Sequence, residues 1–141
     1  AIISCMDTRL LELIPAALGL KNGDVKMIKN AGGVISHPFG SAVRSLLIAI
    51  YELGVEQVMV IGHTDCGAQS LNSKRVLADK NIDMLKFCGL DVESWLNGFD
   101  SVEEAIKSSV ELIRKHPLIP SDIKINGFII DSITGELKIL I

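Results

Sequence analysis

One stretch constrains the fold of this chain more than any other: VMVIGHTDCG, residues 58–67. A short apolar run leads into Gly62, after which His63 and Cys66 stand three positions apart with Asp65 between them. An apolar run this short, ended by a glycine, predicts a buried strand that presents functional groups at its carboxyl end. The stretch therefore predicts a sheet with a site at one edge.

Strands and helices alternate along most of the chain. Strands are predicted over residues 1–5, 25–29, 56–61, 123–131 and 136–141. Helices are predicted over 10–20, 38–53, 69–80, 81–90 and 100–116, and 91–100 is predicted to be a loop or turn region. The SITG turn before the last strand predicts a hairpin. This order predicts an α/β fold with a mainly parallel central sheet flanked by helices and a C-terminal antiparallel edge strand.

The composition limits the classes of partner. The 141 residues fit one domain, 1–141, and no apolar run approaches the roughly 20 residues that span a bilayer, so no membrane is expected. A net charge of -3 without a Lys/Arg cluster gives no footprint for nucleic acid. Three cysteines without disulfide spacing favour a reducing, cytoplasmic compartment and thiolate or metal chemistry.

A third metal ligand is expected from the first strand. All parallel strands point their carboxyl ends to one edge of a sheet, so Cys5 is expected to converge with His63 and Cys66. Two thiolates and one imidazole suit tetrahedral zinc and leave a fourth position for water, as in a catalytic site. Asp7 and Arg9 follow in the next turn, where an Asp beside an Arg stays ionised and oriented.

These motifs carry a family resemblance. The C-x-D-x-R segment, followed about fifty residues later by G-H-x-x-C-G, resembles the β-class carbonic anhydrases, and the H-T-D-C-G form is similar to their small, compact branch. The resemblance runs from residue 1 to the terminal hairpin and includes NAGG (30–33) and HPLIP (116–120). It implies zinc (Zn2+) on Cys5, His63 and Cys66, and reversible hydration of CO2 to bicarbonate and a proton.

The resemblance also implies roles for other residues. Asp7 and Arg9 are the expected catalytic dyad, in which Asp7 orients the nucleophile and Arg9 keeps Asp7 from the metal. Gly32, Gly33 and Gly67 are expected to bind substrate, because only glycine lets the main chain approach so closely. Two thiolates neutralise the zinc charge, so activity is expected to rise at alkaline pH.

Family members carry a helix before the first strand that packs on a partner subunit. The chain opens with AIISC, in the middle of a strand-like run, so we expect a single zinc-enzyme domain without that helix. We also expect a homodimer or a higher even-numbered homo-oligomer.

Two other functions stay open, and a third fits the residues poorly. The same scaffold could hydrolyse a CO2-like substrate such as carbon disulfide, or hold zinc without turnover. A phosphatase that uses Cys5 as nucleophile would need a longer anion-binding loop before its arginine. Four residues carry open roles: His37 as a proton shuttle or surface residue, Asp65 as an orienting group or a turn former, Cys88 as a small core residue, and His116 as a residue at a helix C-terminus.

Overall fold

A five-stranded sheet forms the centre of the chain, seen in a computed structural model that describes residues 1–80 and 91–141. The strand order is β2-β1-β3-β4-β5. The first four strands are parallel, and β5 runs antiparallel to β4 at the edge. The strands are β1 (Ile2–Cys5), β2 (Met27–Asn30), β3 (Gln57–His63), β4 (Lys124–Ile130) and β5 (Leu137–Ile139). The predicted fold class is confirmed.

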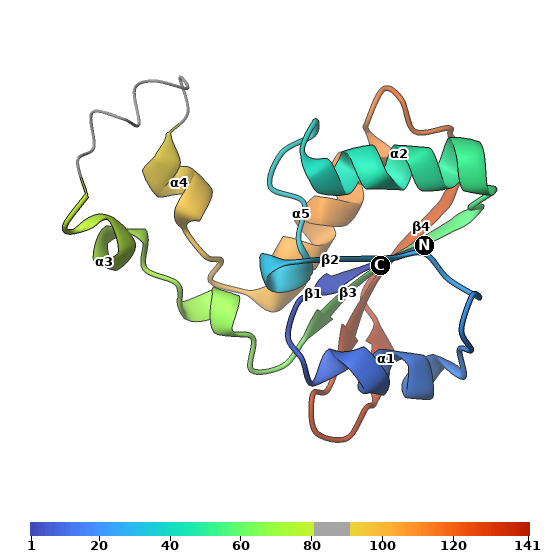
Figure 1. Cartoon of the computed structure of the whole chain (residues 1–141), viewed down its shortest axis with the longest axis horizontal. Helices are drawn as coiled ribbons and strands as arrows, with labels where there is room; N and C mark the ends of the chain where they lie inside the picture. Colours follow the sequence, from blue (N-terminus) through green and yellow to red (C-terminus); the bar gives the residue numbers. More distant parts are fainter. Residues whose placement is uncertain (81–90) are drawn as a thin grey trace.

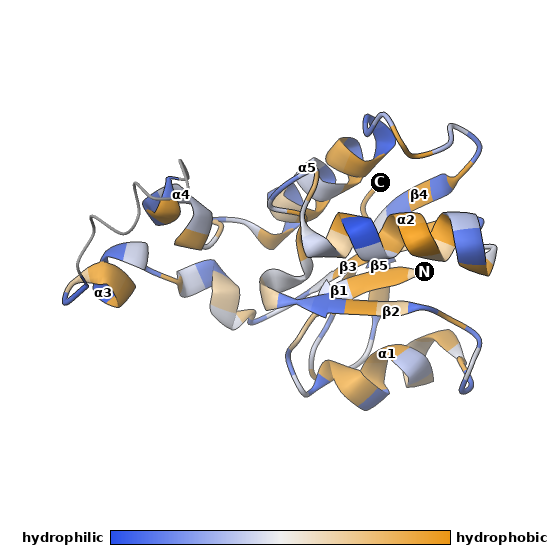
Figure 2. Ribbon diagram, turned by 45° about the horizontal axis from the view of Figure 1, so that its top comes forward, coloured by the Kyte–Doolittle hydropathy of each residue, from blue (hydrophilic) through white to orange (hydrophobic). Residues whose placement is uncertain are grey.

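Helices cover both faces of the sheet (Figure 1). Helix α1 (Leu10–Leu18) lies on one face, and α2 (Ser41–Leu53) and α5 (Val102–Arg114) lie on the other. Each face has its own apolar cluster, and Figure 2 shows that β1 between them is hydrophobic. All four residues of β1 are buried, as expected for a strand covered on both faces.

Glycines bring α5 close to the sheet. A Cβ atom on Gly62 of β3 would lie 2.6 Å from the Cδ1 atom of Ile106. A Cβ atom on Gly127 of β4 would lie 2.6 Å from the Cγ2 atom of the same isoleucine. Ile106 is 1% exposed, so these two glycines make room for one buried side chain of α5.

The ends of the long helices follow the sequence. Gly19 caps the C-terminus of α1 and Gly54 that of α2, and both glycines adopt the left-handed conformation that favours this residue. The hydroxyl of Ser101 accepts a hydrogen bond from the Glu104 N–H and caps α5. Helix α5 ends at Arg114, two residues before the predicted end.

The segment after β3 differs from the prediction. Instead of one helix over 69–80, the structure has the 3-10 turn η2 (Gly67–Ser70) and the five-residue helix α3 (Ser73–Leu77). The predicted loop over 91–100 contains the helix α4 (Val92–Leu96), whose N-terminus is capped by the Asp91 side chain. Helices α3 and α4 extend away from the body in Figure 1. The predicted helix over 81–90 and Cys88 lie outside the described residues.

Within residues 1–80 and 91–141, every helix is too short or too polar to traverse a lipid bilayer.

Candidate metal centre

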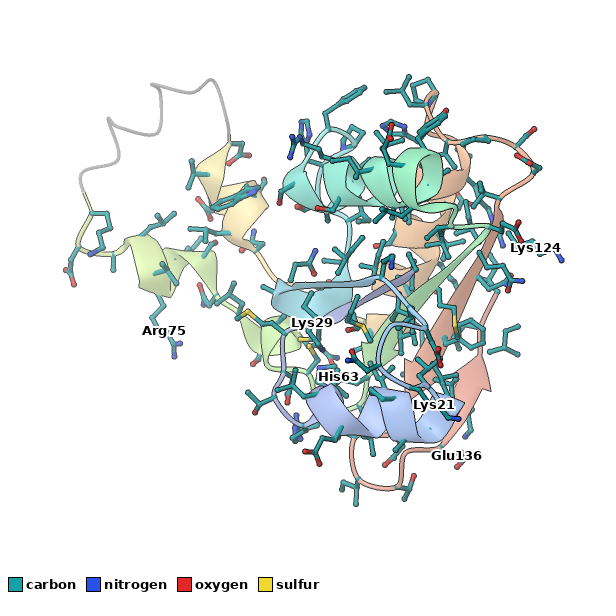
Figure 3. The ribbon with its side chains drawn as sticks, turned by 45° about the vertical axis from the view of Figure 1, so that its right-hand side comes forward. Lys21, Lys29, His63, Arg75, Lys124 and Glu136 are labelled. Atoms are coloured by element: carbon teal, nitrogen blue, oxygen red, sulfur yellow. The ribbon has the colours of Figure 1, made fainter. Side chains whose placement is uncertain are left out.

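Cys5, His63 and Cys66 meet at the carboxyl edge of the sheet. Cys5 ends β1 and His63 ends β3, which are neighbouring strands, and Cys66 follows in the next turn. Their ligand atoms all lie within 4.8 Å of one another, and all three side chains are buried. Figure 3 shows His63 far from Lys124, which begins β4 at the opposite edge. The parallel sheet thus brings together the three side chains that the sequence singled out.

The three ligand atoms suit a tetrahedral zinc ion. The Cys5 and Cys66 sulfurs lie 3.9 Å apart, and zinc with tetrahedral Zn–S bonds needs about 3.8 Å between two sulfurs. The Nδ1–H of His63 donates to the Thr64 carbonyl at 2.8 Å, so Nε2 carries the lone pair. Nε2 is buried and has no hydrogen-bond partner among the described residues. A buried acceptor without a partner is costly unless something binds it, and a cation would.

Burial sets the charge of two of these groups. Desolvation lowers the pKa of His63, which keeps the imidazole neutral and able to act as a ligand. Desolvation raises the pKa of the Cys66 thiol, so in the metal-free protein the proton stays on sulfur. Metal binding at this cluster would therefore release protons.

Asp7 and Arg9 form an ion pair beside the cluster. The Nη2 atom of Arg9 lies 2.7 Å from Oδ2 of Asp7, and its Nε atom donates to Oδ1 at 3.1 Å. The hydrogen bonds from Arg9 lower the pKa of Asp7 to about 2, so the carboxylate is ionised at neutral pH. Its Oδ2 atom lies 4.0 Å from Nε2 of His63. An anchored carboxylate therefore stands next to the ligand atoms, as the sequence suggested.

Arg9 has further partners that the sequence did not reveal. Its Nη1 atom donates to the Asp65 carboxylate at 3.1 Å and lies 3.5 Å from the Ser132 hydroxyl. Its Nη2 atom also donates to the Asp65 carbonyl at 3.0 Å. The position of Asp65 between His63 and Cys66 was the only sequence signal for this contact, because Arg9 comes from a segment 56 residues away.

Lys29 is a second residue that the sequence did not single out. Its ammonium donates to the Cys5 carbonyl at 2.9 Å and to the Ser4 hydroxyl at 3.2 Å. Figure 3 shows Lys29 and His63 at the same edge of the sheet. Lys29 thus brings a positive charge and a hydrogen bond to the strand end that carries Cys5.

The three glycines have different surroundings. Gly32 and Gly33 have φ values of 82° and 67° in the 3-10 turn η1 (Ala31–Gly33), a conformation that favours glycine. A Cβ on Gly33 would lie 2.6 Å from the Cys5 nitrogen, and one on Gly32 would lie 2.7 Å from the Phe99 ring. These glycines admit close approach by the protein itself. A Cβ on Gly67 would meet nothing within 4 Å in the described part of the chain.

The two other histidines lie outside the cluster. His37 is exposed in a loop, where its Nδ1 atom accepts a hydrogen bond from the Phe39 N–H. It borders a cavity of about 390 Å³ that none of Cys5, His63 and Cys66 lines. His116 is 4% exposed and makes hydrogen bonds with the Pro38 carbonyl and the Leu118 N–H. It follows the C-cap Lys115 of α5, and its N–H donates to the Ile113 carbonyl in the last turn, so its expected place at a helix C-terminus is confirmed.

Comparison with known proteins agrees with this geometry. The profile of the family described as carbonic anhydrase matches residues 1–137. The candidate carbonic anhydrase YtiB of Bacillus subtilis is 47% identical over 149 residues, which cover 100% of this chain and 80% of that protein. A carbon disulfide hydrolase of Acidithiobacillus thiooxidans is 33% identical over 154 residues, and the aligned region covers 97% of this chain and 74% of that protein.

A solved structure extends the similarity to three dimensions. The crystal structure of β-carbonic anhydrase isoform I from Trichomonas vaginalis superposes with a TM-score of 0.89 at 37% sequence identity. The match covers 99% of this chain and 80% of that one. Sequence profile, relatives and fold agree over almost the whole chain, and the chain therefore belongs to the β-carbonic anhydrase family.

Proposed function

We propose that this chain catalyses the reversible hydration of CO2 to bicarbonate and a proton, with zinc held by Cys5, His63 and Cys66. The observation that carries the proposal is the buried Cys-His-Cys cluster, in which Nε2 of His63 lacks a hydrogen-bond partner among the described residues. When bound there, zinc supplies the Lewis acidity that makes water a nucleophile near neutral pH.

Asp7 is proposed to orient the attacking water. As a carboxylate it can only accept hydrogen bonds, so a water beside it must point a hydrogen at Asp7 and a lone pair elsewhere. Arg9 donates to both oxygens of Asp7, which holds the carboxylate 4.0 Å from the His63 Nε2 atom and limits its approach to the ligand atoms. Gly32, Gly33 and Gly67 are proposed to border the substrate.

The ligand assignment is tested with Cys66→Ala. We expect loss of both bound zinc and CO2 hydration, because two remaining ligands cannot hold zinc tightly at a catalytic site. Metal analysis and a stopped-flow hydration assay measure the two properties, with Cys88→Ala as the matched cysteine control. Retention of stoichiometric zinc by Cys66→Ala would contradict the assignment.

The pH profile is a second test. Two thiolates leave less positive charge on zinc than neutral ligands do, so kcat/KM for hydration is expected to rise at alkaline pH. A profile that stays flat down to pH 6 would count against this mechanism.

Wild-type protein with full zinc and no hydration activity would favour a zinc-binding protein without turnover.

Carbon disulfide is the second candidate substrate, supported by the 33% identity to the carbon disulfide hydrolase. The two linear substrates differ in size and polarity, but both are attacked at carbon by water. Assays of both substrates on one zinc-loaded sample separate the two functions by their kcat/KM values.

We also propose an even-numbered homo-oligomer, with a homodimer as the smallest form. Large apolar side chains on the surface support it: Phe39 is 65% exposed and Trp95 is 55% exposed. Sedimentation velocity measures the assembly, and a monomer at micromolar concentration would contradict the proposal. The free thiols of Cys5 and Cys66 fit the further proposal of a cytoplasmic location.

A further inference from the structure

We propose that Asp65 is a positioning residue for the reaction, which acts by holding the edge of the Arg9 guanidinium next to the edge that Asp7 holds. The inference rests on the proposed function of the site. Asp65 lies between His63 and Cys66, so it ties Arg9 to the turn that carries two of the proposed ligands.

All three nitrogens of the Arg9 guanidinium have hydrogen-bond partners. Nε donates to Asp7, and Nη2 is shared between the Asp7 carboxylate at 2.7 Å and the Asp65 carbonyl at 3.0 Å. Nη1 donates to the Asp65 carboxylate at 3.1 Å. A guanidinium is planar, so partners on two of its edges fix both its position and its plane. Asp7 alone would hold only one edge.

The backbone conformation of Asp65 supports a functional role for this residue. Its φ of 54° makes it the only non-glycine residue with a positive φ in the described part of the chain. Its side chain is 87% exposed, so the residue is not there to fill the core. A non-glycine residue in this conformation at a site edge stores strain that the surroundings must offset, which is typical of functional turns.

Arg9 needs such a second anchor because it lies near the surface. Its side chain is 41% exposed, and an exposed ion pair is weak because water and salt screen it. The contact with Asp65 limits the swing of the guanidinium and therefore of Asp7. Asp65 does not touch the reacting atoms, and its effect passes through Arg9.

Two substitutions separate positioning from folding. Asp65→Asn and Asp65→Gly both tolerate a left-handed backbone, but Asn keeps one side-chain acceptor and Gly keeps none. We expect kcat/KM for CO2 hydration to fall about threefold in Asp65→Asn and about tenfold in Asp65→Gly, with zinc content unchanged. The free energy of unfolding is expected to be unchanged or higher in Asp65→Gly, because glycine relieves the positive φ. A merely structural role predicts no loss of activity there.

Nuclear magnetic resonance of the zinc-free protein gives a readout independent of activity. Restricted rotation should give separate Nη1 and Nη2 proton signals for Arg9 in the wild type, assigned by their absence in Arg9→Lys. We expect these signals to merge in Asp65→Gly and to persist in Asp122→Asn, which removes an exposed charge before β4 at the other edge of the sheet.

The outcomes distinguish the two proposals. Unchanged arginine signals in Asp65→Gly overturn the positioning role, whether or not activity falls. Unchanged kcat/KM in an active enzyme also overturns it. If the zinc-loaded wild type hydrates no CO2, the proposed function fails, and the arginine signals alone still decide whether Asp65 fixes Arg9.

Discussion

Gly33 and Gly67 were both expected beside the substrate, but the structure gives them different physical roles. Gly33 has a left-handed backbone and packs on the chain at Ser4 and Cys5, whereas Gly67 has open space where a side chain would be. The first glycine is required for folding, because its backbone contacts the strand end that carries a proposed ligand. Packing within the described part of the chain does not require a glycine at position 67, because a Cβ atom there would meet nothing within 4 Å.

Gly33→Ala and Gly67→Ala form a matched pair. We expect Gly33→Ala to lower the free energy of unfolding by about 1–3 kcal/mol, because alanine is strained at positive φ and its Cβ meets backbone atoms. Gly67→Ala should change it by less than about 0.5 kcal/mol. Urea unfolding of the metal-free proteins measures both changes. Equal effects in the two variants would contradict the distinction.

The sequence predicted contacts between residues at the ends of strands, but not side-chain contacts between segments that are distant in the chain. The convergence of Cys5, His63 and Cys66 follows from one rule about parallel strands. The contacts of Arg9 with Asp65 and of Lys29 with the Cys5 carbonyl do not follow from such a rule, because they depend on side-chain paths between distant segments. The hydrogen bonds of buried His116 were missed for the same reason.

At the scale of elements, α5 shows how a helix is seated on a sheet. Gly62 and Gly127 lie on the neighbouring strands β3 and β4, and the Ile106 side chain fits over both. Val102 adds a second contact over Gly62, where its Cγ1 atom would lie 2.7 Å from an added Cβ. Since His63 follows Gly62, the seating of α5 also fixes the strand end at the site.

Gly127→Ala tests this seating away from the proposed ligands. We expect a loss of about 1–3 kcal/mol in the free energy of unfolding, because the added Cβ would lie 2.6 Å from the Ile106 Cγ2 atom. Ile106→Ala alone should cost about 2–5 kcal/mol through the cavity it leaves. The double variant should lose less than the sum, since the new methyl group occupies part of that cavity. Strict additivity in denaturant titrations would show that the two side chains do not meet.

The elements predicted best are those with a strong repeating pattern. The helices α2 and α5 bury one continuous face, and the strands β1 and β3 are short runs of mostly buried apolar residues, which their sequences display. The short helices α3 and α4 have five residues each, too few for a pattern, and depend on the side-chain caps of Asn72 and Asp91. The segments 69–80 and 91–100 were therefore predicted incorrectly.

At the scale of the whole molecule, several carboxylates bind protons less readily in the folded chain than in free solution. Hydrogen bonds or an ion pair lower the pKa of each: Arg9 for Asp7, Ser94 for Asp91, Lys115 for Glu111, and the N–H groups of Thr134 and Ile133 for Asp131. The unfolded chain therefore binds more protons than the folded chain at acidic pH, and stability rises with pH in that range.

The stability of the metal-free protein is expected to fall as the pH is lowered from about 4 towards 2, the pKa of Asp7 in the folded chain. Asp131→Asn should be less stable than the wild type at pH 6, and this difference should shrink at lower pH, where the wild-type carboxyl is also protonated. Urea midpoints measured between pH 6 and 2.5 test both statements. A constant difference between wild type and Asp131→Asn would show that ionised Asp131 does not stabilise its turn.

The neighbouring position of β1 and β3 has a consequence for how the chain acquires its site. Ile2 pairs with Met59, 57 positions later, so the two strands meet only after a long loop has closed. Cys5 then comes within reach of Cys66. Metal binding is consequently coupled to the formation of the β1–β3 strand pair. Added zinc should therefore slow hydrogen–deuterium exchange of the β1 and β3 amides more than that of the amides of the edge strand β5.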